Sequence, residues 1–106
     1  MIYNTEPIVY MIEKITDRNG NKRIDGRYPS RIGSYFIFQS KPMVGKCMLL
    51  GYVDWPSMIP IRGILRTSTV KEIWTWDKGS ALKIGTVNSI YHFKAMAPYS
   101  PSEGVE

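Results

Sequence analysis

The stretch Arg66-Thr67-Ser68-Thr69 places one guanidinium and three hydroxyls in a row, directly before the apolar residue Val70. Guanidinium and hydroxyl groups both donate hydrogen bonds to phosphate oxygens, and arginine adds the opposite charge. Threonine is equally a good strand residue, whose hydroxyl can satisfy backbone groups at a bend. We favour the bend, and keep as the alternative one wall of an anion site that contains Arg66, Thr67 and Ser68.

A second basic segment runs from Arg18 to Arg31 and contains four arginines but only one lysine. Arginine presents a planar fork of donors that matches phosphate, and its plane can also stack on a nucleobase. Tyr28 and Tyr35 lie close by in sequence and offer further stacking surfaces. The alternative interpretation is a solvated loop that keeps the protein soluble. The predicted phosphate ligands in this segment are Arg18, Arg23, Arg27 and Arg31, with Tyr28 and Tyr35 as ligand-binding aromatic residues.

Trp74 and Trp76 are two residues apart, so in a strand they share one face with Glu72, and Ile73 lies on the opposite face. Two tryptophans on one face either pack at the edge of the core or stack on nucleobases. We expect core or core-edge packing for the pair. Base stacking by Trp76 is kept as part of the predicted ligand site.

Catalytic chemistry has few candidate residues in this chain. There is one histidine, His92, and one cysteine, Cys47, and the carboxylates are scattered without the spacing of metal ligands. Ser89 and His92 are three apart, which in a strand places them on opposite faces. The glycines of the basic segment do not match a phosphate-binding loop. The sequence therefore predicts a protein that is not an enzyme and that uses no metal and no cofactor.

The elements that must position these residues are short strands separated by turn residues. No window keeps a helical period, whereas β-branched and aromatic runs alternate with glycine, proline and asparagine. This pattern is typical of a small all-β single domain, an SH3-like or OB-like barrel of about 6–7 antiparallel strands. We expect one domain over residues 1–96 and a flexible tail over residues 97–106. The expected strands cover residues 7–15, 31–39, 46–54, 59–66, 70–76, 81–87 and 89–96.

The charge of the 106-residue chain is uneven along its length. The formal net charge is +5, and residues 14–46 hold eight bases against two acids. Such a concentration of positive charge favours an anionic partner. No apolar run reaches the roughly 18 residues that span a bilayer, so no membrane partner is expected. A single cysteine and the lack of a secretory signal pattern favour a cytoplasmic location.

Two parts of the sequence together resemble a pattern in small all-β accessory proteins of bacteriophages and Gram-positive bacteria. In that pattern a basic R-T-S-x-V strand is followed by a T-x-N-S-x-Y strand. Here the first element is Arg66, Thr67, Ser68 and Val70, and the second is Thr86, Asn88, Ser89 and Tyr91. The resemblance covers about a third of the chain. It implies a phage-encoded or mobile-element protein that acts by binding: it sequesters a nucleotide messenger, masks nucleic acid, or blocks a host defence complex.

Two functions of different classes therefore stay open. The first is non-enzymatic binding of a phosphate-bearing ligand, either a nucleotide, including cyclic signalling nucleotides, or nucleic acid. The second is a protein-interaction module that inhibits a larger host complex, with its contacts at the Trp76-to-Ser80 tip and in the loop around Trp55. The sequence also leaves open a homo-oligomer that binds its ligand between subunits.

Overall fold

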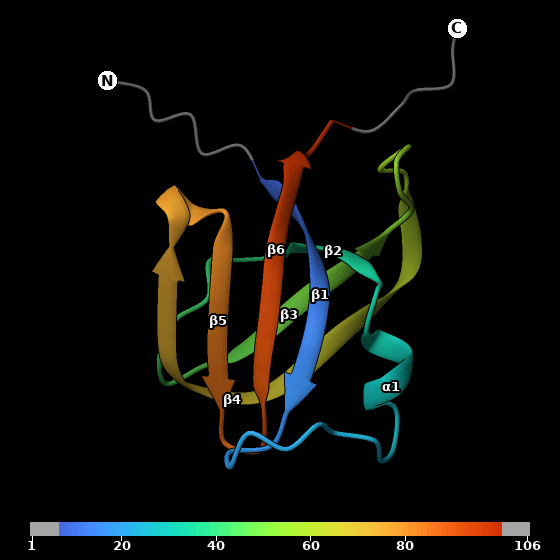
Figure 1. Ribbon diagram of the computed structural model, residues 1–106. Helices are drawn as coiled ribbons and strands as arrows, with labels where there is room; N and C mark the ends of the chain where they lie inside the picture. Colours follow the sequence, from blue (N-terminus) through green and yellow to red (C-terminus); the bar gives the residue numbers. More distant parts are fainter. Residues whose placement is uncertain (1–6, 101–106) are drawn as a thin grey trace, which may run out of the picture.

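The structure is a computed structural model that describes residues 7–100, and within them six antiparallel strands form one closed barrel (Figure 1). Each strand pairs with the next along the chain, and the last pairs back with the first. The predicted small all-β barrel is confirmed. The strands are β1 (Ile8–Thr16), β2 (Tyr35–Phe38), β3 (Cys47–Val53), β4 (Pro60–Trp76), β5 (Ala81–Thr86) and β6 (Ile90–Pro98).

The long strand β4 replaces two strands that the sequence led us to expect at residues 59–66 and 70–76. Its first part pairs with β3 as far as Thr69, and its second part pairs with β5 from Val70 onward. The polar residues between them interrupt the apolar pattern without ending the strand, because threonine and serine adopt extended backbone readily. The strand changes partner at this stretch, which makes it a corner of the barrel.

The basic segment contains the short helix α1 (Tyr28–Arg31), with Pro29 in its first turn. We expected an irregular stretch here and a strand from residue 31, and both expectations were wrong. Proline is well tolerated in the first helical turn, where its missing N–H would have no partner in any case. The following strand β2 begins only at Tyr35 and has four residues.

The core fills the inside of the barrel, and alternation between buried and outward residues is clearest on β5 and β6. On β5, Leu82 and Ile84 are buried, whereas Lys83 between them points outward. The same alternation buries Tyr91 and Phe93 on β6 on either side of His92. Strands of this kind present one apolar face to the core and one polar face to solvent. The outer face of the barrel is therefore available for function.

The last strand extends further than the predicted domain. β6 continues to Pro98, beyond the expected end at residue 96, and the Tyr99 N–H donates to the Pro7 carbonyl at 2.7 Å. Of the predicted tail, residues 101–106 lie outside the described residues.

Within residues 7–100, the structure contains no helix of the length and apolar character required for a membrane span.

Candidate functional site

Arg18 forms a two-pronged ion pair with Glu72 of β4. Two guanidinium nitrogens donate to the Glu72 carboxylate at 2.8 and 2.6 Å, and one of them also donates to the Thr86 carbonyl at 3.1 Å. The pair lies over Gly85, where a Cβ would collide with both side chains. The Arg18 guanidinium also holds the pKa of the Glu72 carboxyl below its usual range. Arg18 thus anchors the loop after β1, and its charge is already matched.

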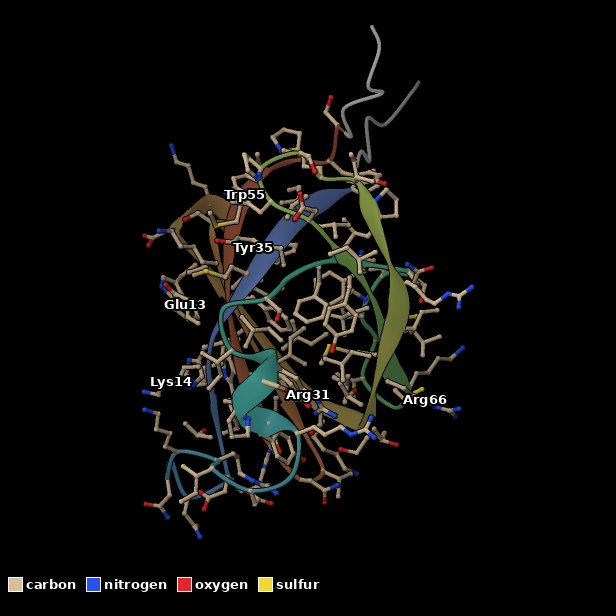
Figure 2. All side chains as sticks on the ribbon, turned by 90° about the vertical axis from the view of Figure 1, so that its right-hand side faces the viewer. Glu13, Lys14, Arg31, Tyr35, Trp55 and Arg66 are labelled. Carbon is tan, nitrogen blue, oxygen red and sulfur yellow. The ribbon has the colours of Figure 1, made fainter. Side chains whose placement is uncertain are left out.

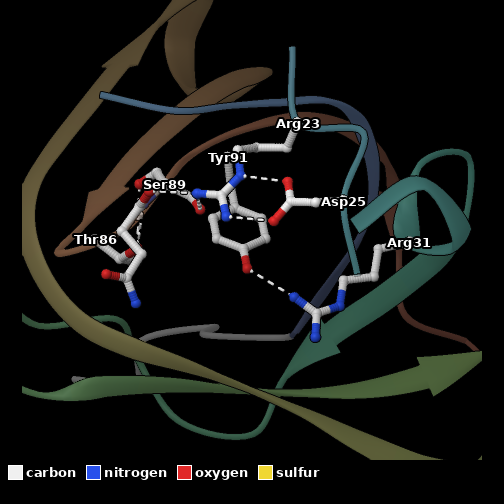
Figure 3. Close-up of polar contacts among 7 residues, drawn as sticks. Arg23, Asp25, Arg31, Thr86, Ser89 and Tyr91 are labelled. Atoms are coloured by element: carbon white, nitrogen blue, oxygen red, sulfur yellow. Dashed lines mark hydrogen bonds and ion pairs between the residues drawn. The ribbon is translucent and has the colours of Figure 1, made fainter. Parts of the chain in front are cut away.

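Arg23 is held at one end of the barrel by four partners, and Figure 3 shows its polar contacts, including those with Asp25 and Ser89. Its guanidinium pairs with Asp25 at 3.0 Å, and it also donates to the Asn88 carbonyl at 2.8 Å and to the Ser89 hydroxyl at 3.1 Å. It lies over the Tyr28 ring at 4.2 Å. These contacts tie the basic segment to the connection between β5 and β6. Arg23 is therefore mainly a structural residue.

Arg31 and Tyr28 complete the same closure. Arg31 donates to the Tyr91 hydroxyl at 3.1 Å, and Tyr91 itself is buried in the core (Figure 3). The Arg31 guanidinium also lies 5.0 Å from the centre of the Tyr28 ring, so that ring already has two arginine partners. Burial raises the pKa of Tyr91, which keeps its hydroxyl protonated beside the arginine. Arg31 and Tyr28 thus serve the closure of the barrel end, and their ligand contacts stay a prediction.

The predicted wall of an anion site at Arg66, Thr67 and Ser68 does not meet the basic segment. Arg66 points outward from β4, away from α1 and Arg31 (Figure 2). The Thr67 hydroxyl accepts the Met48 N–H at 3.0 Å and donates to the Ser68 carbonyl at 2.8 Å, and the side chain is buried. These bonds serve the sheet corner, and ligand binding by Thr67 stays a prediction. Ser68 is half-buried beside it, and Arg27 is exposed just before α1.

Trp74 and Trp76 are exposed on the outer face, so the expectation that they pack at the core was wrong. Their exposed fractions are 40% and 47%, which is high for residues in the middle and at the end of a paired strand. They share one face of β4, as their spacing predicted. Register places them on the outside, because Trp74 is opposite the outward Lys83 and Trp76 is opposite Ala81. Both indoles are thus partly exposed to solvent.

Strand register extends the Trp74 position into a row across four strands. Trp74 is opposite Lys83 on β5, Lys83 is opposite His92 on β6, and His92 is opposite Lys14 on β1. The Lys83 ammonium lies 4.7 Å from the centre of the Trp74 ring. Figure 1 shows β5, β6 and β1 side by side at the front of the barrel, with the end of β4 next to β5. The row therefore lies on one continuous surface.

A second row runs parallel to the first, two residues further along β4. Trp76 is opposite Ala81, Ala81 is opposite Lys94, Lys94 is opposite Met11, and Met11 is opposite Tyr35 on β2. Ala81 has a small side chain, so the surface between the Trp76 indole and the Lys94 ammonium is not covered. This row adds one exposed cation and an aromatic residue at each end.

The far end of the second row is reinforced by Trp55. The Trp55 ring stacks on Tyr35 with their centres 5.3 Å apart and an angle of 14° between the planes. Tyr35 and Trp55 lie on the same side of the barrel as Glu13 and Lys14, which point away from it (Figure 2). Of the residues predicted to bind a ligand, the structure thus places Tyr35 and Trp76 in one row. We call the two rows together the aromatic-basic face.

The electrostatics of the aromatic-basic face follow from its lysines. Partial burial lowers the pKa of the His92 imidazole below its usual value, the flanking Lys14 and Lys83 lower it further, and Glu13 acts in the opposite direction. An anion bound over His92 would favour its charged form. At one border of the face Glu72 is already paired with Arg18. The face as a whole attracts anions.

Lys14, Lys83, Lys94 and His92 were not among the predicted ligand residues. Lys83, His92 and Lys94 are outward positions of alternating strands, and that alternation was visible in the sequence. Lys14 faces outward because a β-bulge between Ile12 and Lys14 shifts the register of β1, which the sequence did not show. Nothing in the sequence shows, however, which strands are neighbours, and these residues are brought together only by register.

Comparison of the chain with protein-family models, with curated proteins and with solved structures gave no match.

Proposed function

We propose that the protein is a non-enzymatic binder of single-stranded nucleic acid, and that the strand lies across the aromatic-basic face. The observation that carries the proposal is the exposure of Trp74 and Trp76 on one face, with Lys83 opposite Trp74 and Lys94 two strands away from Trp76 in the same row. Aromatic residues interleaved with cations on a sheet surface are the common means of binding unpaired strands.

Two exposed indoles favour an unpaired strand over a duplex. Trp74 and Trp76 are two residues apart on β4, so their Cα atoms are separated by about 7 Å. Each indole can stack on one of two successive bases. In a duplex the faces of the bases are covered by their neighbours, and a flat protein surface cannot reach them. The tryptophan pair thus selects single strands.

The lysines supply the contacts to the phosphate backbone. The tryptophans lie on β4. Lys83 lies on the neighbouring strand β5, Lys94 on the next strand β6, and Lys14 on β1 after that. Neutralising phosphates with lysine releases counterions, so the affinity must fall steeply with salt. Contacts of this kind carry no base specificity, and binding across the face is expected to tolerate different sequences.

A nucleic-acid strand fits this surface better than a free nucleotide does. Small nucleotides are usually held in a concave pocket that encloses most of the ligand. The aromatic-basic face is the outer side of a closed barrel, and its functional side chains extend over four or five strands. An extended ligand uses all of them at once. Masking of nucleic acid is also one of the activities implied by the resemblance to phage accessory proteins.

The test is fluorescence anisotropy with labelled oligothymidylate and with a labelled duplex, at about 50 and about 200 mM salt. The wild type should bind the single strand more tightly than the duplex and lose affinity at the higher salt. Trp74→Ala and Trp76→Ala should each weaken binding by about tenfold or more. Ile64→Ala is the matched control, because Ile64 is an exposed apolar residue on the part of β4 that pairs with β3.

Two results would overturn the proposal. One is the absence of single-strand binding at the lower salt concentration, which would leave the protein-interaction module as the surviving hypothesis. The other is binding that Trp74→Ala, Trp76→Ala and Ile64→Ala all leave unchanged.

A further inference from the structure

A basic surface hollow borders the aromatic-basic face at Lys14. Its volume is about 510 Å³. Lys14 belongs both to the hollow and to the row that begins at Trp74. The residues that line it are Glu13, Lys14, Lys22, Arg23, Ile24, Pro29 and Ile32.

The turn after β1 brings Lys22 back toward Lys14. The Asp17 carboxylate accepts the backbone N–H groups of Asn19 and Asn21 at 2.8 and 2.9 Å, which closes the turn. These bonds also lower the pKa of the Asp17 carboxyl. Beyond the turn, Lys22 forms a bridge to Thr16 at the end of β1. The position of Lys22 is thus set by backbone hydrogen bonds.

The backbone pairing continues one residue further. The Arg23 N–H donates to the Ile15 carbonyl at 3.0 Å. This contact continues the antiparallel course of the turn and brings Ile24 alongside Lys14. The hollow is therefore part of the folded hairpin that follows β1.

The chemistry of the hollow combines free positive charge with apolar surface. Within residues 7–100 neither Lys14 nor Lys22 forms an ion pair, whereas the Arg23 charge is matched by Asp25. Ile24 is 78% exposed although it is a large aliphatic residue. With Pro29 it offers an apolar surface next to two ammonium groups. A nucleotide has matching parts: its phosphate is negatively charged, and it is attached to a sugar and to a base with largely apolar faces.

We propose that this hollow is a subsite for the next nucleotide of the strand bound on the aromatic-basic face. Lys14 and Lys22 contact its phosphate, and Ile24 and Pro29 contact its sugar and base. The inference rests on the proposed function, because the strand must first lie on the face and reach Lys14. Glu13 faces the same hollow, and its carboxylate keeps the strand's phosphates on the lysine side.

The length of the oligonucleotide distinguishes this subsite from the face itself. The row from Trp74 to Lys14 spans three strand-to-strand steps from β4 to β1, about 14 Å, so a short strand is held there by the tryptophans. We would compare oligothymidylates of about 4 and about 12 nucleotides. Lys22→Ala should lower the salt slope by about 0.7 for the long strand and leave it unchanged for the short one. Ile24→Ser should weaken the long strand only.

Two further variants are controls. Lys22→Arg keeps the charge and should restore the salt slope for the long strand. Lys41→Ala removes a lysine that lines a different hollow, beside Pro7 and Phe38, and should have no effect on either length.

The outcomes separate the two proposals. If Lys22→Ala changes neither length, or both equally, the subsite is overturned, while weakening by Trp74→Ala still supports the face. If the wild type binds neither strand, the proposed function fails, and the subsite fails with it.

Discussion

Lys83 and Trp74 are direct neighbours on β5 and β4, and the Lys83 ammonium lies 4.7 Å from the centre of the Trp74 ring. A cation over an indole is attracted by the negative face of the ring. Both side chains lie on the outer surface, because Lys83 alternates with the buried Leu82 and Ile84 and Trp74 is directly opposite Lys83. The tryptophan is thereby oriented before a ligand arrives, which lowers the entropy lost on binding.

The first prediction is that Lys83 and Trp74 act together in binding. In a double-mutant cycle, Lys83→Ala and Trp74→Ala should each weaken binding of oligothymidylate, and the double variant should lose less than the sum of the two. The coupling should be about 0.5–1 kcal/mol. The measurement is anisotropy titration of all four proteins at one salt concentration. Strictly additive losses would mean that the contact does not orient the indole.

The second prediction concerns pH and His92. Partial burial is the largest cause that lowers the pKa of the imidazole in the free protein, and Lys14 and Lys83 lower it further. A bound strand places phosphates nearby and raises that pKa again, so binding takes up a proton. The affinity should therefore increase as the pH falls from about 7.5 to about 5.5.

The control for this effect is His92→Gln, which should bind with little pH dependence in the same range. His92 is the one histidine of the chain, so the slope cannot pass to another imidazole. In the absence of nucleic acid the sign is reversed. The pKa of His92 is lower in the folded protein than in the unfolded chain. As the pH falls below the pKa that His92 has in the unfolded chain, the free energy of unfolding should therefore decrease. An affinity that is equal at both pH values in the wild type would contradict the prediction.

The third prediction is a gain of affinity on removing Glu72. The Glu72 carboxylate neutralises Arg18 at the border of the aromatic-basic face. In Glu72→Gln the guanidinium keeps its place over Gly85 but loses its counter-charge, and the low-salt affinity should rise several-fold. The salt slope should steepen by about 0.7 if Arg18 gains one phosphate contact.

Arg18 itself supplies the control for the Glu72 variant. The double variant Glu72→Gln with Arg18→Gln should return to the wild-type affinity or below it. Both proteins can be compared with the wild type by circular dichroism to confirm that the barrel is retained. An affinity gain that survives the loss of Arg18 would show that repulsion by Glu72, and not release of the arginine, is the cause.

The fourth prediction separates two arginines that the sequence placed in one role. Arg23→Ala removes the donor to the Asn88 carbonyl and to the hydroxyl of the buried Ser89. The free energy of unfolding should fall by about 1–3 kcal/mol, because a buried acceptor loses its partner. Arg27→Ala alters only an exposed side chain and should stay within about 0.5 kcal/mol of the wild type. Denaturant titration measures both, and equal losses would show that Arg23 does not close the barrel end.

Much of the fold could be predicted from the sequence because strand alternation is a local property. Leu82, Lys83 and Ile84 alternate visibly, and the turn at Asn19 and Gly20 is a strong local signal. The continuity of β4 could not be predicted, because a strand that changes partner at Thr69 looks like two strands in its residue pattern. Whether hydrogen bonds continue through such a stretch depends on the neighbouring strands.

The sequence by itself determined that the chain forms a small antiparallel barrel, that Trp74 and Trp76 share a face, and that positive charge is concentrated near the N-terminal third. Tertiary structure alone decided which face is outside, and it placed both tryptophans there. It also paired the predicted phosphate ligands Arg18, Arg23 and Arg31 with Glu72, Asp25 and Tyr91. Alternation tells which residues lie together on a strand, but register between strands places Trp74 in line with Lys14, and register is set by how the whole barrel closes.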